Sequence, residues 1–155
     1  MPDMLVKLYE IPDLSPSIEA LAREGIVVRA ARTPEKPRVL EWTGEHFGPW
    51  MREAEACFSR VPVSCLLALR GQTILGFACY DSICPNFFGP TGVLEAERKR
   101  GIGRALLLAA LHAQKAQGFA YAIIGGVGPA EYYSKTVGAV LIEGSQPGIY
   151  DGLIF

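Results

Sequence analysis

The sequence has no long hydrophobic run. Its longest uninterrupted apolar stretch, Ala105–Leu111, has seven residues, whereas a transmembrane helix needs about 20. The N-terminus also lacks a basic segment followed by an apolar one, which is the pattern of a secretory signal. We therefore expect neither a membrane span nor a signal peptide.

Cysteine is scarce, and its spacing offers no metal site. The four cysteines form no C-x-x-C pair, and no histidine lies near them at zinc-finger spacing. Three of the four lie in apolar segments, which favours buried thiols in a reducing compartment over disulfides. These observations predict a cytoplasmic protein that holds no metal.

Neither sign of charge dominates the chain. It has 15 basic and 16 acidic residues and a net charge of −1, which disfavours a protein that coats nucleic acid or binds membranes through a polybasic surface. Half of the 155 residues are apolar, which is enough for a hydrophobic core. This length fits one domain, so we expect a single domain over residues 1–155.

Apolar patterns and turn residues predict a mixed order of strands and helices. We expect strands at Met4–Ile11, Ile26–Ala31, Val63–Arg70, Thr73–Tyr80, Thr91–Glu95, Phe119–Ile124, Ala139–Ile142 and Ile149–Phe155. We expect helices at Ile18–Glu24, Glu35–Phe47, Pro49–Arg60, Gly101–Gln117 and from Pro129 to Gly138, with a break at Phe87–Pro90. The two strands around Gly71 form a hairpin, and the strand–helix–strand unit over 91–124 forms a parallel crossover.

Positive charge is concentrated at the start of the longest predicted helix. Residues 1–97 carry a net charge of −4 and residues 98–155 one of +3. Four basic residues and two glycines lie within seven positions there: Arg98, Lys99, Arg100, Gly101, Gly103 and Arg104. The first turn of a helix has unpaired N–H groups and a positive dipole end, and glycine allows a phosphate to approach the backbone. The pattern therefore predicts a phosphate-binding site.

Two common phosphate-binding motifs are absent from this segment. The P-loop pattern G-x-x-x-x-G-K-[ST] does not occur, and Leu106 occupies the third glycine position of the dinucleotide pattern G-x-G-x-x-G. The segment Arg98–Gly103 instead matches the motif [QR]-x-x-G-x-[GA], and in this respect the sequence resembles the GCN5-related N-acetyltransferases (GNAT). The preceding strand residue Val93, the apolar helix, the strand over 119–124 and the aromatic pair near Gly138 extend the resemblance to about residues 25–155.

The resemblance implies an α/β (α+β) fold, with a mixed, mostly antiparallel sheet, a central parallel strand pair and flanking helices. It also implies that acetyl-CoA is the cosubstrate. Backbone N–H groups around residues 100–104 would bind its pyrophosphate, and an amide near Val93 or Leu94 would polarise the thioester carbonyl. The implied cofactor-binding residues are Val93, Leu94, Arg98, Lys99, Arg100, Gly101, Ile102, Gly103, Arg104 and Ala105.

The resemblance further implies a tyrosine that protonates the departing CoA thiolate, and Tyr133 is the residue that matches it. The family places this tyrosine four residues before a glycine, but five residues separate Tyr133 from Gly138. A local bulge in the helix would absorb the extra residue, and Tyr132 is the alternative. The asparagine that often follows the preceding strand in the family is replaced by glycines 125, 126 and 128, so its contact with CoA is absent or made by backbone.

The sequence does not identify the general base. Glu95 stands near the end of the central strand, and Asp81 and His46 are alternatives. The aromatic stretch Trp42, His46, Phe47 and Trp50 is typical of a core, and part of it would line the acceptor pocket.

We therefore expect an N-acetyltransferase that moves acetyl by direct attack to an amine of a small molecule or peptide. A non-catalytic acyl-CoA-binding module is the alternative, and nucleic-acid binding is disfavoured by the net charge. Residues 1–24 precede the resemblance. They would add an edge strand and a helix, or mediate self-association, for example as a homodimer.

Overall fold

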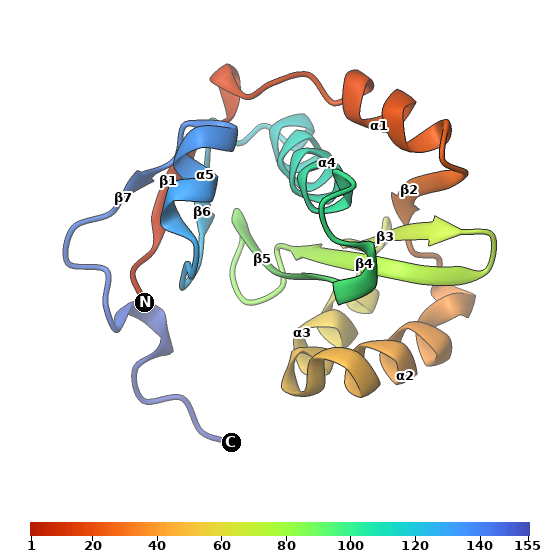
Figure 1. Cartoon of the computed structure of the whole chain (residues 1–155). Coiled ribbons are helices and arrows are strands. Elements are labelled where there is room, and N and C mark those ends of the chain that lie inside the picture. Colours follow the sequence, from red (N-terminus) through yellow and green to blue (C-terminus); the bar gives the residue numbers. More distant parts are fainter.

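In a computed structural model that describes all residues 1–155, seven strands form one mixed sheet in the order β2-β3-β4-β5-β6-β1-β7 (Figure 1). The strands are β1 (Met4–Lys7), β2 (Ile26–Ala30), β3 (Cys65–Arg70), β4 (Thr73–Tyr80), β5 (Phe87–Val93), β6 (Tyr121–Ile124) and β7 (Val140–Leu141). The helices are α1 (Ser15–Ala22), α2 (Lys36–Phe47), α3 (Met51–Ala56), α4 (Ile102–Ala116) and α5 (Ala130–Val137). Only β5 and β6 are parallel, which confirms the predicted fold class.

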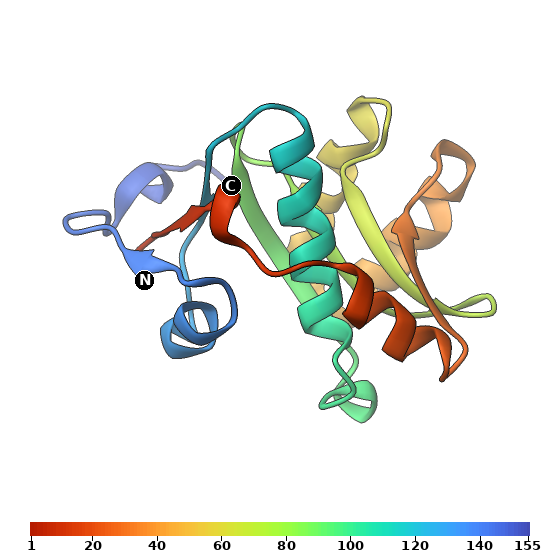
Figure 2. The same ribbon diagram turned by 90° about the horizontal axis from the view of Figure 1, so that it is seen from above.

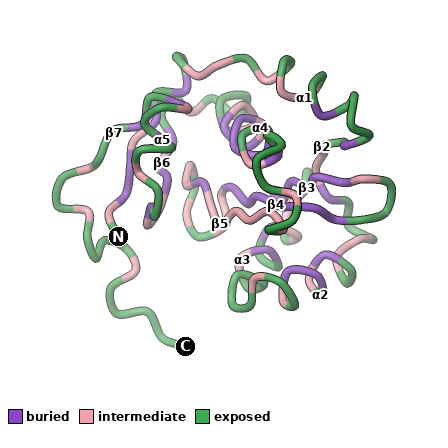
Figure 3. The backbone as a smooth tube through the Cα atoms, in the orientation of Figure 1, coloured by how far each residue is buried: buried purple, intermediate pink, exposed green.

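The helices cover both faces of the sheet. Helices α1 and α4 lie on one face and α2 and α3 on the other (Figure 1). Buried residues accordingly form two clusters, one built around α4 and one between the sheet and α2. Helix α4 is buried along most of its length because the run Ala105–Leu111 contains no polar residue, and the tube in Figure 3 is buried along both α4 and β4. The two clusters hold the strand β5 between them.

The hairpin of β3 and β4 and the long helix α4 follow the predicted bounds closely, but β5 does not. The predicted break at Phe87–Pro90 is wrong, because β5 already begins at Phe87. The register between β4 and β5 shifts between Ala78 and Tyr80, opposite this segment. At such an irregularity a proline can enter a strand, since its missing N–H costs no ladder hydrogen bond.

The parallel pair of β5 and β6 is short, and the two strands then separate. Their register contains only the pairs Phe87↔Ile123 and Phe88↔Ile124. Beyond these residues β5 continues beside β4 to Val93, while the chain after β6 turns away at Gly125. The separation leaves one side of β5 without a neighbouring strand.

The N-terminal segment enters the sheet as an inner strand, not as an edge strand. β1 pairs antiparallel with both β6 and β7, and the chain then crosses α4 to reach α1 (Figure 2). The expected strand at Ile149–Phe155 is wrong: residues Gly148–Tyr150 form a 3-10 turn and the rest is exposed. On this side the sheet therefore ends at β7.

The segment after α2 differs from the single helix predicted at Pro49–Arg60. Gly48, with a φ of 53°, ends α2, and α3 is flanked by 3-10 turns on both sides. The resulting bend places α3 below β4 and β5 (Figure 1). None of the helices combines the length and the apolar character that a membrane span requires.

Candidate active site

A cleft of about 490 Å³ opens where β5 and β6 separate. Its walls come from the end of β5, the loop that follows it, the first turn of α4 and the first turn of α5. Seven of the ten predicted cofactor-binding residues line it: Val93, Arg98, Lys99, Gly101, Ile102, Gly103 and Arg104. Leu94, Arg100 and Ala105 do not, whereas both candidate tyrosines, Tyr132 and Tyr133, do.

At one end of the cleft, the first turn of α4 presents unpaired backbone donors. Gly101 precedes the helix in the left-handed conformation, with a φ of 87°, and no side chain caps the helix. The first hydrogen bond of α4 runs from the Ala105 N–H to the Gly101 carbonyl at 3.1 Å. The N–H groups of residues 102–104 therefore have no partner within the helix, and they coincide with its positive dipole end.

The space in front of this turn is open. A Cβ atom added at Gly103 would meet only the Val93 side chain, at 3.8 Å. A phosphate oxygen can therefore approach these N–H groups closely, which is the arrangement that binds phosphate at helix N-termini.

The basic side chains around the turn fall into two groups. Arg100 is held by Glu97 at 3.0 Å and by Glu24 at 3.4 Å, and Glu97 also accepts two hydrogen bonds from Arg70 at 2.9 and 3.3 Å. The Arg70 hydrogen bonds lower the pKa of Glu97. Three basic side chains of the cluster take part in no ion pair and can bind an anion: Arg98, Lys99 and Arg104.

The backbone of β5 distinguishes the two amides considered for the thioester carbonyl. The Leu94 N–H donates to the Leu75 carbonyl of β4 at 2.9 Å. Because N–H groups alternate in direction along a strand, the N–H of Val93 points away from β4 and toward the cleft. The Val93 carbonyl has the same direction, since it accepts a hydrogen bond from Arg98 Nε at 3.3 Å. Of the two, Val93 has the available amide.

At the other end of the cleft, Tyr133 is buried where the parallel strands separate. Its ring packs edge-to-face against Phe88, the last residue of β5 that pairs with β6, at 6.5 Å between centroids. Burial raises the pKa of Tyr133 to about 12. Tyr132 is 40% exposed; partial burial raises its pKa as well, and the positive charge of Arg104 acts against that rise. Of the two tyrosines, Tyr132 is the more exposed and Tyr133 the more buried.

The predicted bulge before Gly138 is wrong. Helix α5 is regular to Val137, and Gly138 ends it in the left-handed conformation with a φ of 69°. The Gly138 N–H donates to the Ser134 carbonyl at 3.0 Å, and the Ala139 N–H to the Tyr133 carbonyl at 3.3 Å. The helix therefore ends in an ordinary left-handed cap and is not distorted between Tyr133 and Gly138.

The glycine turn after β6 is tied to the N-terminal segment. The Gly126 N–H donates to Asp3 Oδ1 at 2.8 Å, and the Val127 N–H donates to the Pro2 carbonyl at 2.9 Å. Asp3 is itself buried, and its carbonyl accepts from the Ile142 N–H at 2.9 Å. These two amides of the turn are therefore not available to replace the absent asparagine.

The candidate bases from the sequence do not gather at the cleft. Glu95 is exposed in the 3-10 turn Glu95–Glu97 and does not line the cleft. Asp81 is tied by Arg60 at 3.0 Å and by Gln114 at 3.1 Å, in a network at the opposite end of β4. His46 packs on Trp42, with ring centroids 5.1 Å apart.

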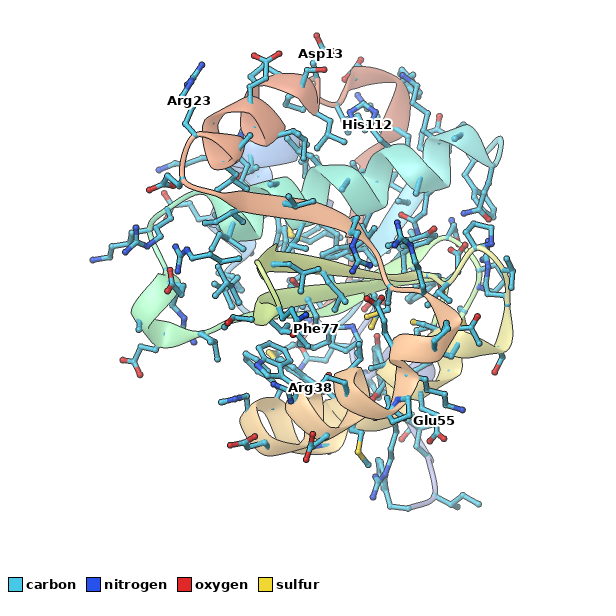
Figure 4. All side chains as sticks on the ribbon, turned by 90° about the vertical axis from the view of Figure 1, so that its right-hand side faces the viewer. Asp13, Arg23, Arg38, Glu55, Phe77 and His112 are labelled. Atoms are coloured by element: carbon cyan, nitrogen blue, oxygen red, sulfur yellow. The ribbon has the colours of Figure 1, made fainter.

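The aromatic stretch of α2 packs against the face of β5 that is turned away from α4. A Cβ atom at Gly92 would lie within 2.8 Å of three ring carbons of Phe47. Phe47 stacks on Trp50 at 5.9 Å and contacts Phe77 at 5.4 Å, and Figure 4 shows Phe77 between the sheet and α2. The stretch is thus partly core and partly exposed, since Trp50 is 41% exposed.

Two residues that the sequence analysis missed lie on this same face. Tyr150, from the C-terminal 3-10 turn, places its hydroxyl where a Cβ atom of Gly125 would be. Glu53 of α3 has a buried carboxylate oxygen without a hydrogen-bond partner. The spacing of Trp50, Glu53 and Cys57 at i, i+3 and i+7 was the available signal for Glu53, since it predicts one helical face.

Known proteins resemble the chain in sequence and in fold. The family model for the acetyltransferase (GNAT) family matches residues 29–135, whereas no curated protein matches the sequence. A region of a fungal multi-domain GH3 β-N-acetylglucosaminidase, described as a GCN5-related glucosamine N-acetyltransferase, aligns with a TM-score of 0.74 at 13% identity, over 91% of this chain and 19% of that chain.

Two bacterial GCN5-related N-acetyltransferases are also similar in fold. For the protein from Sphaerobacter thermophilus the TM-score is 0.65 at 20% identity, over 91% of this chain and 48% of that chain. For a protein from Kribbella flavida the TM-score is 0.60 at 16% identity, over 90% of this chain and 53% of that chain. The chain therefore spans about a fifth to half of the length of these structures.

Proposed function

The chain belongs to the acetyltransferase (GNAT) family, and from this premise we propose that it transfers acetyl from acetyl-CoA to an amine of a small molecule or peptide. Acetyl transfer that depends on an acyl-CoA is the activity of the family. The identity of the acceptor and the residues that take part are the proposed elements. We also propose that residues 1–155 act as one domain.

One observation carries this proposal: a single cleft joins an uncapped helix start to a buried tyrosine. The N–H groups of residues 102–104, with Arg98, Lys99 and Arg104, fit the pyrophosphate of CoA. The cleft then continues along the free side of β5 toward Tyr133. An extended chain with a phosphate at one end and a reactive thioester at the other matches this shape.

The residues of the cleft suggest how the reaction proceeds. The Val93 N–H would donate to the thioester oxygen and stabilise the negative charge that develops there, which is typically worth about 2.7–4 kcal/mol. The amine attacks the carbonyl carbon directly, and the carbon–sulfur bond breaks. Tyr133, with a pKa of about 12, keeps its proton at neutral pH and can donate it to the departing sulfur.

The acceptor is the least constrained element. The similar region of the fungal β-N-acetylglucosaminidase is described as a glucosamine N-acetyltransferase, which supports including amino sugars among the amines tested. Phe47 and Trp50 lie on the face of β5 opposite α4, and they would contact the acceptor near the end of the cleft.

The test combines binding with turnover. Acetyl-CoA is expected to raise the melting temperature by mass action, and wild-type protein is expected to release free CoA with at least one member of an amine library. Tyr133→Phe should keep the shift in melting temperature and lose turnover. Tyr132→Phe, in the neighbouring and more exposed position, is the matched control and should retain turnover.

Each result has a defined meaning. If millimolar acetyl-CoA caused no shift in melting temperature, acetyl-CoA would be refuted as the cosubstrate. A shift without CoA release from any amine would favour the non-catalytic acyl-CoA-binding module. Unchanged turnover in Tyr133→Phe would remove its proposed role as the acid.

A further inference from the structure

A second cavity of about 490 Å³ lies between α1 and the start of α4. One wall comes from residues within 12–21, and the other comes from Arg100, Gly101 and Arg104. Gly101 and Arg104 also line the cleft of the candidate active site. Helix α4 has α5 on one side and α1 on the other (Figure 1), so the two spaces adjoin at the first turn of this helix.

The wall that carries α1 is held in place by contacts with α4 and with the segment before α4. His112 Nε2 donates a hydrogen bond to the Pro12 carbonyl at 2.8 Å, and Leu21 is buried in the cluster around α4. Beyond the other end of α1, Glu24 pairs with Arg100 at 3.4 Å. The fold itself therefore forms this wall, from residues that precede the segment 29–135 matched by the family model.

The charges around the second cavity nearly cancel. Arg100 is already paired with Glu24 and Glu97. Of the remaining lining residues only Asp13 and Arg104 are charged, and neither forms an ion pair within the chain. One free carboxylate and one free guanidinium do not favour a second phosphate, because the carboxylate repels it. The cavity instead suits a neutral group that has both polar atoms and an apolar surface.

We propose that the second cavity binds the adenosine of acetyl-CoA, so that the protein prefers thioesters of coenzyme A to thioesters carried on phosphopantetheine alone. This inference rests on the proposed acetyl transfer. In coenzyme A the pyrophosphate joins the pantetheine arm to the adenosine. A pyrophosphate on the N–H groups of residues 102–104 therefore places the adenosine next to Gly101 and Arg104, the two residues that the cleft and the second cavity share.

The lining of the second cavity matches the chemistry of adenosine. Three small apolar residues, Pro12, Pro16 and Ala20, offer contact to the flat face of the purine. The Asp13 carboxylate can accept a hydrogen bond from the exocyclic amine of the purine or from a ribose hydroxyl. Because Arg104 borders both spaces, its planar guanidinium can pair with the pyrophosphate and stack on the purine.

The test compares three acetyl thioesters that share the pantetheine arm. Acetyl-CoA carries the complete nucleotide, acetyl-dephospho-CoA lacks the 3′-phosphate, and acetyl-4′-phosphopantetheine lacks the adenosine. Calorimetry measures the dissociation constant of each. Ser17 lines the second cavity, so the ring added by Ser17→Phe should fill it. This variant should weaken the first two thioesters by the same factor, about tenfold, and leave acetyl-4′-phosphopantetheine unchanged.

Two further variants control for folding and for the bulk of the added ring. Ser15→Phe places the same ring at an exposed position of α1 that lines neither the cleft nor the second cavity, and it should leave all three dissociation constants unchanged. Asp13→Ala removes the hydrogen-bond acceptor without filling the cavity. It should weaken acetyl-CoA and acetyl-dephospho-CoA by about fivefold and leave acetyl-4′-phosphopantetheine unaffected.

Several results would overturn the inference while the proposed function stands. Binding of all three thioesters that is weakened equally by Ser17→Phe, or by none of the variants, would show that the cavity does not hold the adenosine. A loss confined to acetyl-CoA, or tighter binding of acetyl-CoA to Asp13→Ala, would show that the cavity takes the 3′-phosphate instead. A wild type that binds none of the three thioesters would refute the proposed function itself.

Discussion

Gly92→Ala is the substitution that tests the packing beside the cleft most sharply. Gly92 lies in β5 next to Val93, and a Cβ atom there would lie within 2.8 Å of three carbons of the Phe47 ring. Phe47 has little room to move, because Trp42, Trp50 and Phe77 surround it at 5.6, 5.9 and 5.4 Å. The added methyl group must therefore displace the aromatic cluster.

The magnitude follows from two opposing effects. Overpacking a core costs typically about 1–3 kcal/mol, whereas replacing glycine by alanine gains about 0.4–1 kcal/mol through the unfolded chain. We expect a net loss of about 1–2 kcal/mol, which lowers the melting temperature by about 2–8 °C in a chain of this size.

Urea denaturation of the variant, of Phe47→Leu and of the double variant measures this effect. The smaller side chain at residue 47 should relieve the clash, so that the double variant is more stable than additivity predicts by about 1–2 kcal/mol. Gly92→Ala should also lower turnover while keeping the acetyl-CoA shift, because the added methyl group would point toward Phe47, on the proposed acceptor side of β5. Additive free energies of unfolding would refute the proposed contact between Phe47 and Gly92.

Three further substitutions test other parts of the structure. Gly103→Ala should leave the melting temperature of the free protein unchanged, because its Cβ meets only Val93 at 3.8 Å. The same variant should bind acetyl-CoA about tenfold more weakly, as measured by calorimetry. Glu35 has its pKa lowered to about 2 by Arg29, so its stabilisation is present above about pH 4.5 and is lost as the pH falls toward 2. Glu35→Gln should flatten that acid loss, measured as urea midpoints at pH 7 and pH 3. Asp3→Ala frees the Gly126 N–H and should cost about 1.5–3 kcal/mol of unfolding free energy.

Local signals predicted the elements that local interactions determine. Helix α4 was predictable because an apolar run follows Gly101, and the hairpin because two apolar strands flank Gly71. The anion-binding end of the cleft was also predictable, since it is a single contiguous segment, 98–104. Anion binding at this end depends on backbone N–H groups, and the start of α4 alone sets the direction in which they point.

Features that depend on distant pairing were not predictable in this way. The inner position of β1 depends on its simultaneous pairing with β6 and β7, which no local pattern encodes. The apolar residues at 149–155 predict a strand, yet they have no strand partner, because the sheet ends at β7.

The candidate bases show the same limit at the level of single residues. Glu95 is close in sequence to Val93, yet it is exposed on a 3-10 turn. Glu53 lies 42 residues before Glu95, and one of its carboxylate oxygens is buried. Whether a carboxylate is buried therefore depends on how distant elements pack, which no local pattern encodes.

Amide NMR during a titration with acetyl-CoA shows whether the cleft between β5, α4 and α5 holds the CoA arm. The largest amide shifts are expected on Val93 and on residues 102–104, with smaller ones at Tyr133. Shifts that leave these amides unchanged, or that concentrate on the opposite edge of the sheet around β2, would contradict it.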